Sequence, residues 1–222
     1  MNSCATGFFI HRTGFSTRGQ RCTFFTKEYG KISLILFKNK KDIALIPLGV
    51  YEIILTSSPK FGQGTVKSIA LLNGRQFQAY DPAVVAIAYF VCDVVVQTAT
   101  LYVKDDQAYQ TLNALTEDLT QRKSLHSLPC SFLLKWMKSL GILPEGNPCA
   151  TGFDIHEGLM TLQLNQHVQP GVNGLNKLLL DELVNDRKEL RATFDLMLLY
   201  MEYHIPKFNV TKTRTIIHEI FN

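Results

Sequence analysis

The first 41 residues hold most of the side chains that could bind a polyanion. They carry eight basic side chains against the single acid Glu28, a formal charge of +7, whereas residues 42–222 carry fifteen basic and eighteen acidic side chains, a formal charge of −3. The aromatic residues interleaved with these cations are Phe8, Phe9, Phe15, Phe24, Phe25, Tyr29 and Phe37. Cations that displace counterions, combined with rings on which bases stack, are how proteins hold single-stranded nucleic acid. A polyanionic partner is therefore expected to dock on the N-terminal fifth of the chain.

Core packing is the competing interpretation of the same rings. Phe24 and Phe25 point to opposite faces of one strand, so at least one of them belongs to the core, and we expect roughly two-thirds of these rings to be packing residues. Phe15, in a loop beside Arg12 and Arg18, is the best candidate for an exposed stacking ring. The residues predicted to contact DNA are Arg12, Phe15, Arg18, Arg21, Lys27, Lys38, Lys40 and Lys41.

The sequence contains no constellation typical of an enzyme. The segment GQGTVKS at 62–68 lacks the spacing of a phosphate-binding loop, and the six histidines show neither the spacing of a metalloprotease helix nor that of a zinc site. Cys149 and His156 come nearest to a nucleophile with its base, but nothing around them predicts a lowered thiol pKa. We expect no catalysis, no cofactor and no metal, with a hydrolase or thiol enzyme as the remaining alternative.

The cysteines indicate a protein of a reducing compartment, and the apolar segments do not indicate a membrane span. Five cysteines are scattered without a CxxC pair, and no basic and apolar leader opens the chain, so free thiols are expected. The most apolar stretch, 83–102, has Asp93 at its centre, where a charge is costly in lipid. That stretch is predicted to be a buried helix rather than a membrane span.

The first eighty residues are predicted to form strands. Short segments rich in β-branched and aromatic residues alternate with turn signals, at 7–12, 20–27, 31–38, 43–58 and 65–73. Five strands with short connections suggest a small closed barrel, because closure removes exposed edges. A helix following five strands fits an OB-fold, and the pattern leaves an SH3-like barrel open.

The periodicity changes at Asp81-Pro82, a good N-cap followed by a residue tolerated at the first helical position. The helices expected beyond it are 83–102, 106–120, 130–140, 173–184, 187–204 and 212–221. Residues 141–158 are rich in glycine and proline and are expected to be loop, followed by a short hairpin with His156 at its turn. The predicted fold is α+β: an N-terminal OB-fold at 1–80 and an all-α domain at 81–222 with a hairpin insertion.

Several segments, in order, resemble the RecO recombination-mediator (DNA repair) family, most closely its Bacteroidetes-type members. The stretch GFFIHRTGFSTRGQRCTFFTKEYGKISLI at 7–35 is similar to the family's opening strand, turn and hairpin. The segments DPAVVAIAYFVCDVVVQTA, YQTLNAL, SFLLKWMKSLGILPE and FDIHEG resemble its later helices and short hairpin, and LLYMEYHIPKF with TRTIIHEIF resembles its closing segment. The resemblance runs nearly end to end and rests on the order of the segments.

The resemblance implies a non-enzymatic role in recombinational repair of DNA gaps, in the bacterial cytoplasm at the nucleoid. Such proteins bind single- and double-stranded DNA, anneal complementary strands, act with RecR, and displace single-strand-binding protein so that RecA loads. Some members also bind the acidic, apolar C-terminal tail of single-strand-binding protein. The residues that match such a site here are Leu134, Lys135, Trp136 and Lys138. Core packing of Trp136 is the alternative.

Two departures from the family pattern affect what is expected. Many members carry a four-cysteine zinc module in the region that matches 141–158, where only Cys149 is present, so no zinc is expected. The basic loop after the third strand is shortened to KNKKD, which leaves Lys38, Lys40 and Lys41. A protein-interaction adaptor of the same fold with weak direct DNA binding is therefore the alternative function.

Overall fold

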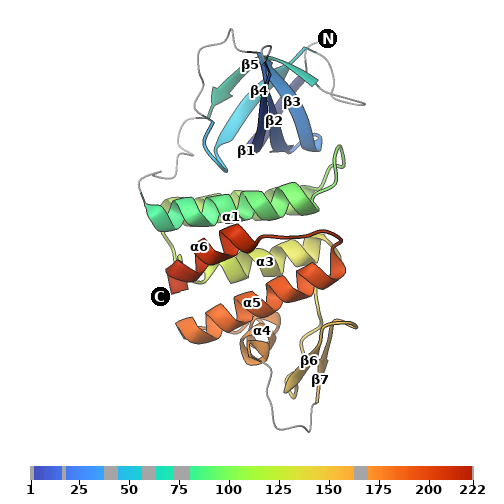
Figure 1. Ribbon diagram of the computed structural model, residues 1–222, viewed down its shortest axis with the longest axis vertical. Coiled ribbons are helices and arrows are strands. Elements are labelled where there is room, and N and C mark those ends of the chain that lie inside the picture. The colour runs from blue at the N-terminus through green and yellow to red at the C-terminus, as the bar shows by residue number, and fades with distance from the viewer. Residues whose placement is uncertain are drawn as a thin grey trace. The chain divides into compact units, whose positions relative to one another are not determined.

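The protein is described by a computed structural model that covers residues 3–16, 19–37, 45–56, 64–72, 81–162 and 170–221 (Figure 1). It confirms the predicted fold class: a closed five-stranded barrel of the OB-fold type, followed by helices α1 to α6. The chain forms two compact units, Met1–Arg122 and Lys123–Asn222. The change from strands to helices comes at Asp81, but α1 and α2 group with the barrel, so the compact units divide later than the 80/81 boundary expected from sequence.

The barrel strands close in the order β1-β2-β3-β5-β4. Their bounds are β1 Ser3–Ser16, β2 Gly19–Thr26, β3 Gly30–Phe37, β4 Val50–Leu55 and β5 Gly64–Leu71. Alternate side chains fill the barrel, with Phe24, Ile32, Leu34 and Ile53 completely buried. The predicted strand 43–58 is shorter in the structure because Pro47 has no N–H to donate and Leu48 takes a positive φ of 57°.

Helix α1, Pro82–Thr98, begins where the sequence predicts and ends earlier. Asp81 caps its start by accepting a hydrogen bond from the Ala83 N–H at 2.9 Å. The last turn of α1 contains no basic residue, and Lys31 of β3 supplies the cation instead by donating from Nζ to the Val96 carbonyl at 2.9 Å. Burial lowers the pKa of the Lys31 ammonium group. After Thr98 the backbone becomes extended at Ala99.

The loop that follows α1 packs on the turn between β2 and β3. The Tyr102 N–H donates to the Lys31 carbonyl at 2.8 Å. Gly30 has a φ of +66°, and a Cβ added there would overlap the Val103 carbonyl oxygen. This close approach joins the end of α1 to the barrel, and α2, Asp106–Gln121, then packs Tyr109 on Phe8 of β1 with ring centroids 5.2 Å apart.

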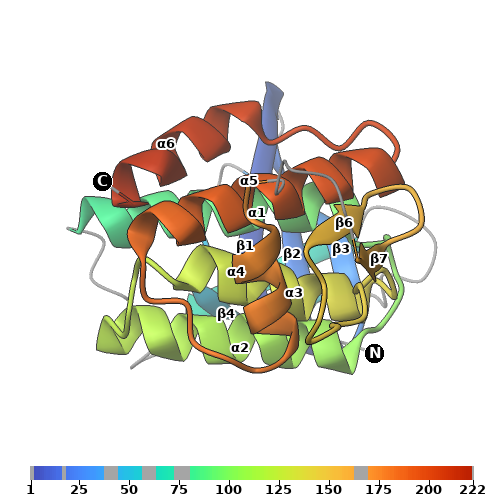
Figure 2. The ribbon, with the colours of Figure 1, turned by 90° about the horizontal axis from the view of Figure 1, so that it is seen from below.

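The second unit is built around α5, Arg187–His204, on which α3, α4 and α6 pack (Figure 2). The bounds of these partners are α3 Leu128–Ser139, α4 Val172–Leu179 and α6 Thr211–Phe221. Leu190, Phe194 and Met197 of α5 are fully buried. Helix α4 ends before the predicted residue 184 because Asp181 takes a φ of 59° and the chain turns, which leaves Leu183 83% exposed.

The predicted short hairpin is present as β6, Gly152–Asp154, and β7, Leu159–Thr161. It is fixed to α5 by two histidines. His204 Nε2 donates to the Ile155 carbonyl at 2.8 Å, and His156 Nδ1 lies 2.6 Å from the Tyr203 hydroxyl oxygen. The hairpin therefore belongs to the fold of the helical unit.

Gly30 and Gly14 form a matched pair for testing the close approach of the α1–α2 loop to the barrel. Both have positive φ, but a Cβ at Gly14 would meet no atom within 4 Å. Gly14→Ala is expected to cost about 1–2 kcal/mol from its backbone conformation alone. Gly30→Ala should cost about 1–3 kcal/mol more, because the added methyl group also displaces the Val103 carbonyl. Urea unfolding followed by circular dichroism, with hydrogen exchange of the β2–β3 amides, measures both, and equal costs would contradict this account.

Candidate nucleic-acid interface

One face of the barrel is half covered and half open. Paired residues on neighbouring strands lie on the same face of the sheet, and the residues alternating with the core residues point outward. We call the half of this outward face next to the β2–β3 turn the lower half. Its members Phe8, Phe25 and Lys31 are at most 9% exposed. These positions lie beneath α1 and α2, through the Lys31–Val96 hydrogen bond and the Phe8–Tyr109 ring contact. The upper half has no such cover among the described residues.

The open half carries polar, cationic and aromatic side chains. Its members on β1, β2 and β3 are exposed or partly exposed: His11, Thr13, Arg21, Thr23, Ser33, Ile35 and Phe37. Thr65 of β5 pairs with Ile35, and the exposed Lys67 follows it two residues along, toward the end of the sheet where Phe37 lies. In OB-folds, this kind of strand surface and its flanking loops bind oligonucleotides. We call this set of residues the open face.

Two bulges interrupt β1, and the first of them places His11 and Thr13 on the open face. The register shifts between Phe9 and His11, so that Phe9 stays in the core while His11 pairs with Thr23 on the outer side. A second shift lies between Thr13 and Phe15, and the residue inserted there is Gly14 with a φ of +59°. A glycine with positive φ at the first position is the usual form of such a bulge.

The cations predicted from sequence do not form one patch in the described residues. Arg21 lies on the open face, paired with Thr13 and Ile35. Arg12 pairs with Cys22, a barrel-core residue, so its position lies on the opposite side of the β1–β2 pair from Arg21. Lys27 follows the other end of β2, six residues or roughly 20 Å along the strand from Arg21. The sequence therefore grouped three cations that the structure separates.

The remaining residues predicted to contact DNA lie next to the ends of β1, β2 and β3 in the sequence. Phe15 lies in β1 and pairs with Gln20, but its side chain is outside the described part of the chain. Arg18, Lys38, Lys40 and Lys41 also lie outside the described residues. The strand ends from which they continue are close together, because Gly19 and Phe37 are register partners.

The aromatic residues divide as the packing interpretation predicts. Phe8, Phe9, Phe24 and Phe25 are at most 5% exposed. Phe37 is 44% exposed and points outward beside Arg21. The sequence contains the signal for this residue: with Ile32, Leu34 and Leu36 pointing inward, the alternation places Phe37 outward. Lys67 was also missed, because its position depends on the pairing of β5 with β3.

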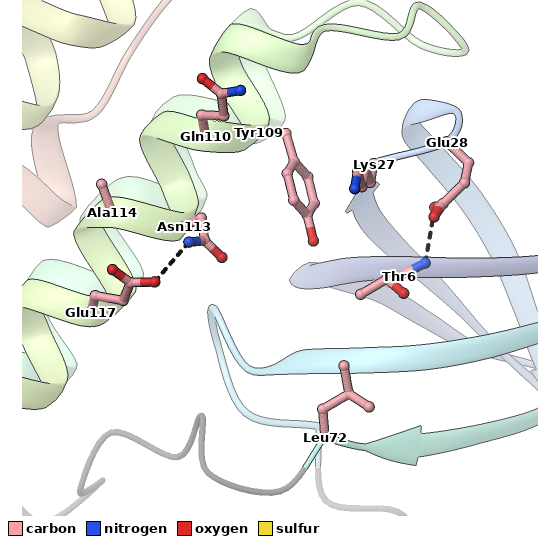
Figure 3. Close-up of a pocket in the computed structure, with 9 residues that line it drawn as sticks. All are labelled: Thr6, Lys27, Glu28, Leu72, Tyr109, Gln110, Asn113, Ala114 and Glu117. Carbon is pink, nitrogen blue, oxygen red and sulfur yellow. Dashed lines mark hydrogen bonds between the residues drawn. The ribbon is translucent and has the colours of Figure 1, made fainter.

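A hollow of about 700 Å³ lies at the opposite end of the barrel, between the β2–β3 turn and α2 (Figure 3). Lys27 lies beside it, with Glu28 on the same wall and Glu117 on the facing wall of α2. Glu28 accepts a hydrogen bond from the Thr6 N–H at 2.9 Å, and Glu117 accepts one from Asn113 Nδ2 at 2.8 Å. Two carboxylates against one ammonium do not favour a phosphate, so Lys27 is poorly placed to contact DNA.

The helical unit has a groove with cations around an apolar floor. It measures about 470 Å³ and is lined by Pro170, Lys188, Arg191, Ala192, Asp195, Leu196, Leu199 and Arg214. Asp195 joins its two walls: it accepts from Arg214 Nε at 2.8 Å and lies 2.8 Å from His218 Nε2, both on α6. Lys188 and Arg191 on α5 are exposed, and the 47% exposed Leu199 continues the apolar floor. We call this the α5–α6 groove.

The partner-tail site predicted on α3 is changed by the structure. Trp136 is 1% exposed and stacks on Phe132 with ring centroids 5.5 Å apart. It is a packing residue, as the alternative interpretation held, and does not line an open groove. Lys135 and Lys138 are exposed and Leu134 is partly exposed, so α3 offers two cations without the aromatic wall expected beside them.

The three buried thiols, Cys22, Cys92 and Cys130, show no sign of activation. Burial raises the pKa of Cys22 to about 11 and that of Cys92 to about 12, and it raises the pKa of Cys130 as well. Cys149 is exposed, and the ring of His156 hydrogen-bonds to Tyr203. Among the described residues, no cluster of three or more His, Cys, Asp or Glu side chains could hold a metal ion.

Comparisons with known proteins do not identify a family for this chain. No protein-family model and no curated protein matches it. Within the described residues, no helix has the length and apolar character needed to cross a membrane. The open face and the α5–α6 groove are therefore the candidate functional surfaces.

Asp195 is expected to hold the α5–α6 groove together. Asp195→Ala removes the acceptor shared by Arg214 and His218, which are only about one-third exposed or less, and should cost about 1–2 kcal/mol of unfolding free energy. Lys188→Ala, an exposed position in the same groove, should cost less than about 0.5 kcal/mol. Fluorescence of Trp136, in the same unit, follows the unfolding. Equal effects of the two substitutions would show that Asp195 has no such role.

Proposed function

We propose that the protein is a non-enzymatic, DNA-binding mediator of recombinational repair that holds single strands on the open face of its barrel. The observation that carries the proposal is the half-covered sheet: the helices bury one half of an outward face and leave Arg21, Phe37 and Lys67 exposed on the other. Of the eight cations in residues 1–41, Arg21 lies on this face, and Arg18 and Lys38 are the sequence neighbours of Gly19 and Phe37, which pair at its end. Strand annealing, action with RecR, displacement of single-strand-binding protein and RecA loading enter the proposal through the resemblance to RecO proteins.

The proposed mechanism uses electrostatics and stacking, without bond chemistry. Arginine and lysine side chains displace counterions from the phosphate backbone, which supplies affinity without sequence preference. An exposed ring adds stacking on unpaired bases, which is also tolerant of sequence. Together, these interactions hold a strand with its bases accessible to a complementary strand, which is what annealing requires.

The proposal predicts a steep dependence of affinity on salt. Log–log plots of affinity for a labelled single strand against salt should fall steeply, and Lys38→Ala, Lys40→Ala and Lys41→Ala together should flatten the slope by roughly 0.7 for each lost phosphate contact. The control is Lys104→Ala, Lys123→Ala and Lys212→Ala, which removes the same charge from exposed lysines that are not predicted to contact DNA. Fluorescence anisotropy measures both. Salt-independent binding, or equal slopes for the two triple variants, would refute the proposed footprint.

The second candidate function is an adaptor that binds an acidic, apolar peptide tail, such as that of single-strand-binding protein. The α5–α6 groove favours it, because Lys188 and Arg191 suit carboxylates while Leu196 and Leu199 suit apolar side chains. The shortened KNKKD loop also favours this function over strong DNA binding. The two functions are compatible, since they use different surfaces.

A peptide that copies such a tail distinguishes the groove from the site predicted on α3. Lys188→Glu with Arg191→Glu should weaken binding of the labelled peptide at least tenfold, because carboxylates then face carboxylates. Lys135→Glu with Lys138→Glu makes the same charge change on α3 and should alter affinity less than threefold. The reverse ranking would return the site to α3. Tight peptide binding with negligible oligonucleotide binding would favour the adaptor over the mediator.

A further inference from the structure

Phe37 carries an exposed aromatic ring that is not part of the barrel core. The inward side chains of β3 are Ile32, Leu34 and the partly buried Leu36, which pack in the barrel. Phe37 points away from this core and is 44% exposed, whereas Phe8, Phe9, Phe24 and Phe25 are at most 5% exposed. Single exposed apolar residues are common on protein surfaces, so the case for Phe37 as a binding residue rests on what lies around it.

Among the described residues, the neighbours of Phe37 on β2 are a glycine and a cation. Its register partner on β2 is Gly19, which has no side chain to cover the ring. A Cβ at Gly19 would lie 2.6 Å from the Leu36 carbonyl oxygen, so the backbone approach itself favours glycine at this position. Arg21 follows two residues along β2 on the same face. The Phe37 ring can stack on a base while the Arg21 guanidinium group contacts a phosphate of the same strand.

Stacking and phosphate contacts respond differently to the form of the nucleic acid. Phosphates are present in single strands and in duplexes, so Arg21 and Lys67 can contact either form. The faces of duplex bases are already stacked on their neighbours, and only an unpaired base can offer its face to a ring. A single stacking ring on an otherwise electrostatic surface therefore makes that surface prefer single strands.

We infer that Phe37 is a base-stacking platform and that it is the residue by which the open face distinguishes single-stranded from double-stranded nucleic acid. This inference rests on the proposed DNA-binding function and adds the chemical form of the ligand to it. Arg21 and Lys67 supply affinity common to both forms, and Phe37 supplies the preference.

The test compares affinities for an oligo(dT) strand and for a duplex of the same length at one salt concentration. Phe37→Ala should weaken binding to the single strand about tenfold and change duplex affinity less than twofold, because stacking contributes to only one of the two. Phe37→Tyr keeps the ring and should restore the preference, whereas Phe37→Leu keeps apolar character and should not. Arg21→Ala should weaken both forms. Equal losses for both ligands in Phe37→Ala would overturn the inference.

Fluorescence supplies an independent readout. Trp136 is the only tryptophan and is 1% exposed, so a Phe37→Trp variant adds a single accessible indole. Stacking predicts that oligo(dT) quenches this indole and that the duplex does not. Single-strand binding without quenching would reject the platform and leave the DNA-binding function standing. If the unaltered protein binds neither ligand, both the inference and the proposed function fail. If Phe37→Ala abolishes only binding of the acidic tail peptide, Phe37 is a protein contact.

Discussion

The arrangement of the barrel and its open face depends on one buried ammonium group. Lys31 projects outward from β3, is 9% exposed, and donates from Nζ to the Val96 carbonyl in the last turn of α1. Burying a lysine is costly unless its charge is compensated, and the carbonyls at a helix C-terminus compensate it. Because the backbone carbonyl of the same residue accepts from Tyr102, the end of α1 and the loop after it are both fixed at this point of the sheet. This anchoring covers one half of the outward face and leaves the other half to solvent.

The alternation of side chains along a strand then decides which cations can act together. Charge bias along the sequence predicted a cationic N-terminal region, but neighbours in sequence point to opposite sides of a strand. Arg12 and Arg21 thus lie on adjacent strands and on different sides of the ribbon, and Lys27 lies at the other end of the barrel beside Glu28. A charged segment becomes a binding surface only where register and bulges bring its members to one face.

The sequence predicted the elements well and the exposure of single residues poorly. Turn signals and periodicity located the barrel strands and most helix ends, because those depend on local chemistry such as the Asp81 N-cap. Pro47 and Leu48 delay the start of β4, which the apolar pattern had placed at residue 43, and Asp181 turns the chain after α4 while its apolar pattern continues. Trp136 shows the limit most clearly, and so do Phe25 and Phe37, which alternation places on the same outward side although only Phe25 is covered. Whether an aromatic residue is buried or exposed depends on what packs over it from distant segments, and no local pattern contains that information.

A surface of cations alone and a surface that also carries a stacking ring differ in the selectivity that they can provide. Counterion displacement gives affinity for any polyanion, so a surface of lysine and arginine alone would hold an annealed duplex as firmly as the strands that formed it. A stacking ring contributes roughly 1–3 kcal/mol to an unpaired base and loses that contribution when the base pairs. Annealing on such a surface would weaken the grip of the protein on its own product by a factor of about five to more than a hundred. An exposed ring on a modestly charged barrel would therefore serve an annealing protein better than a denser cluster of cations.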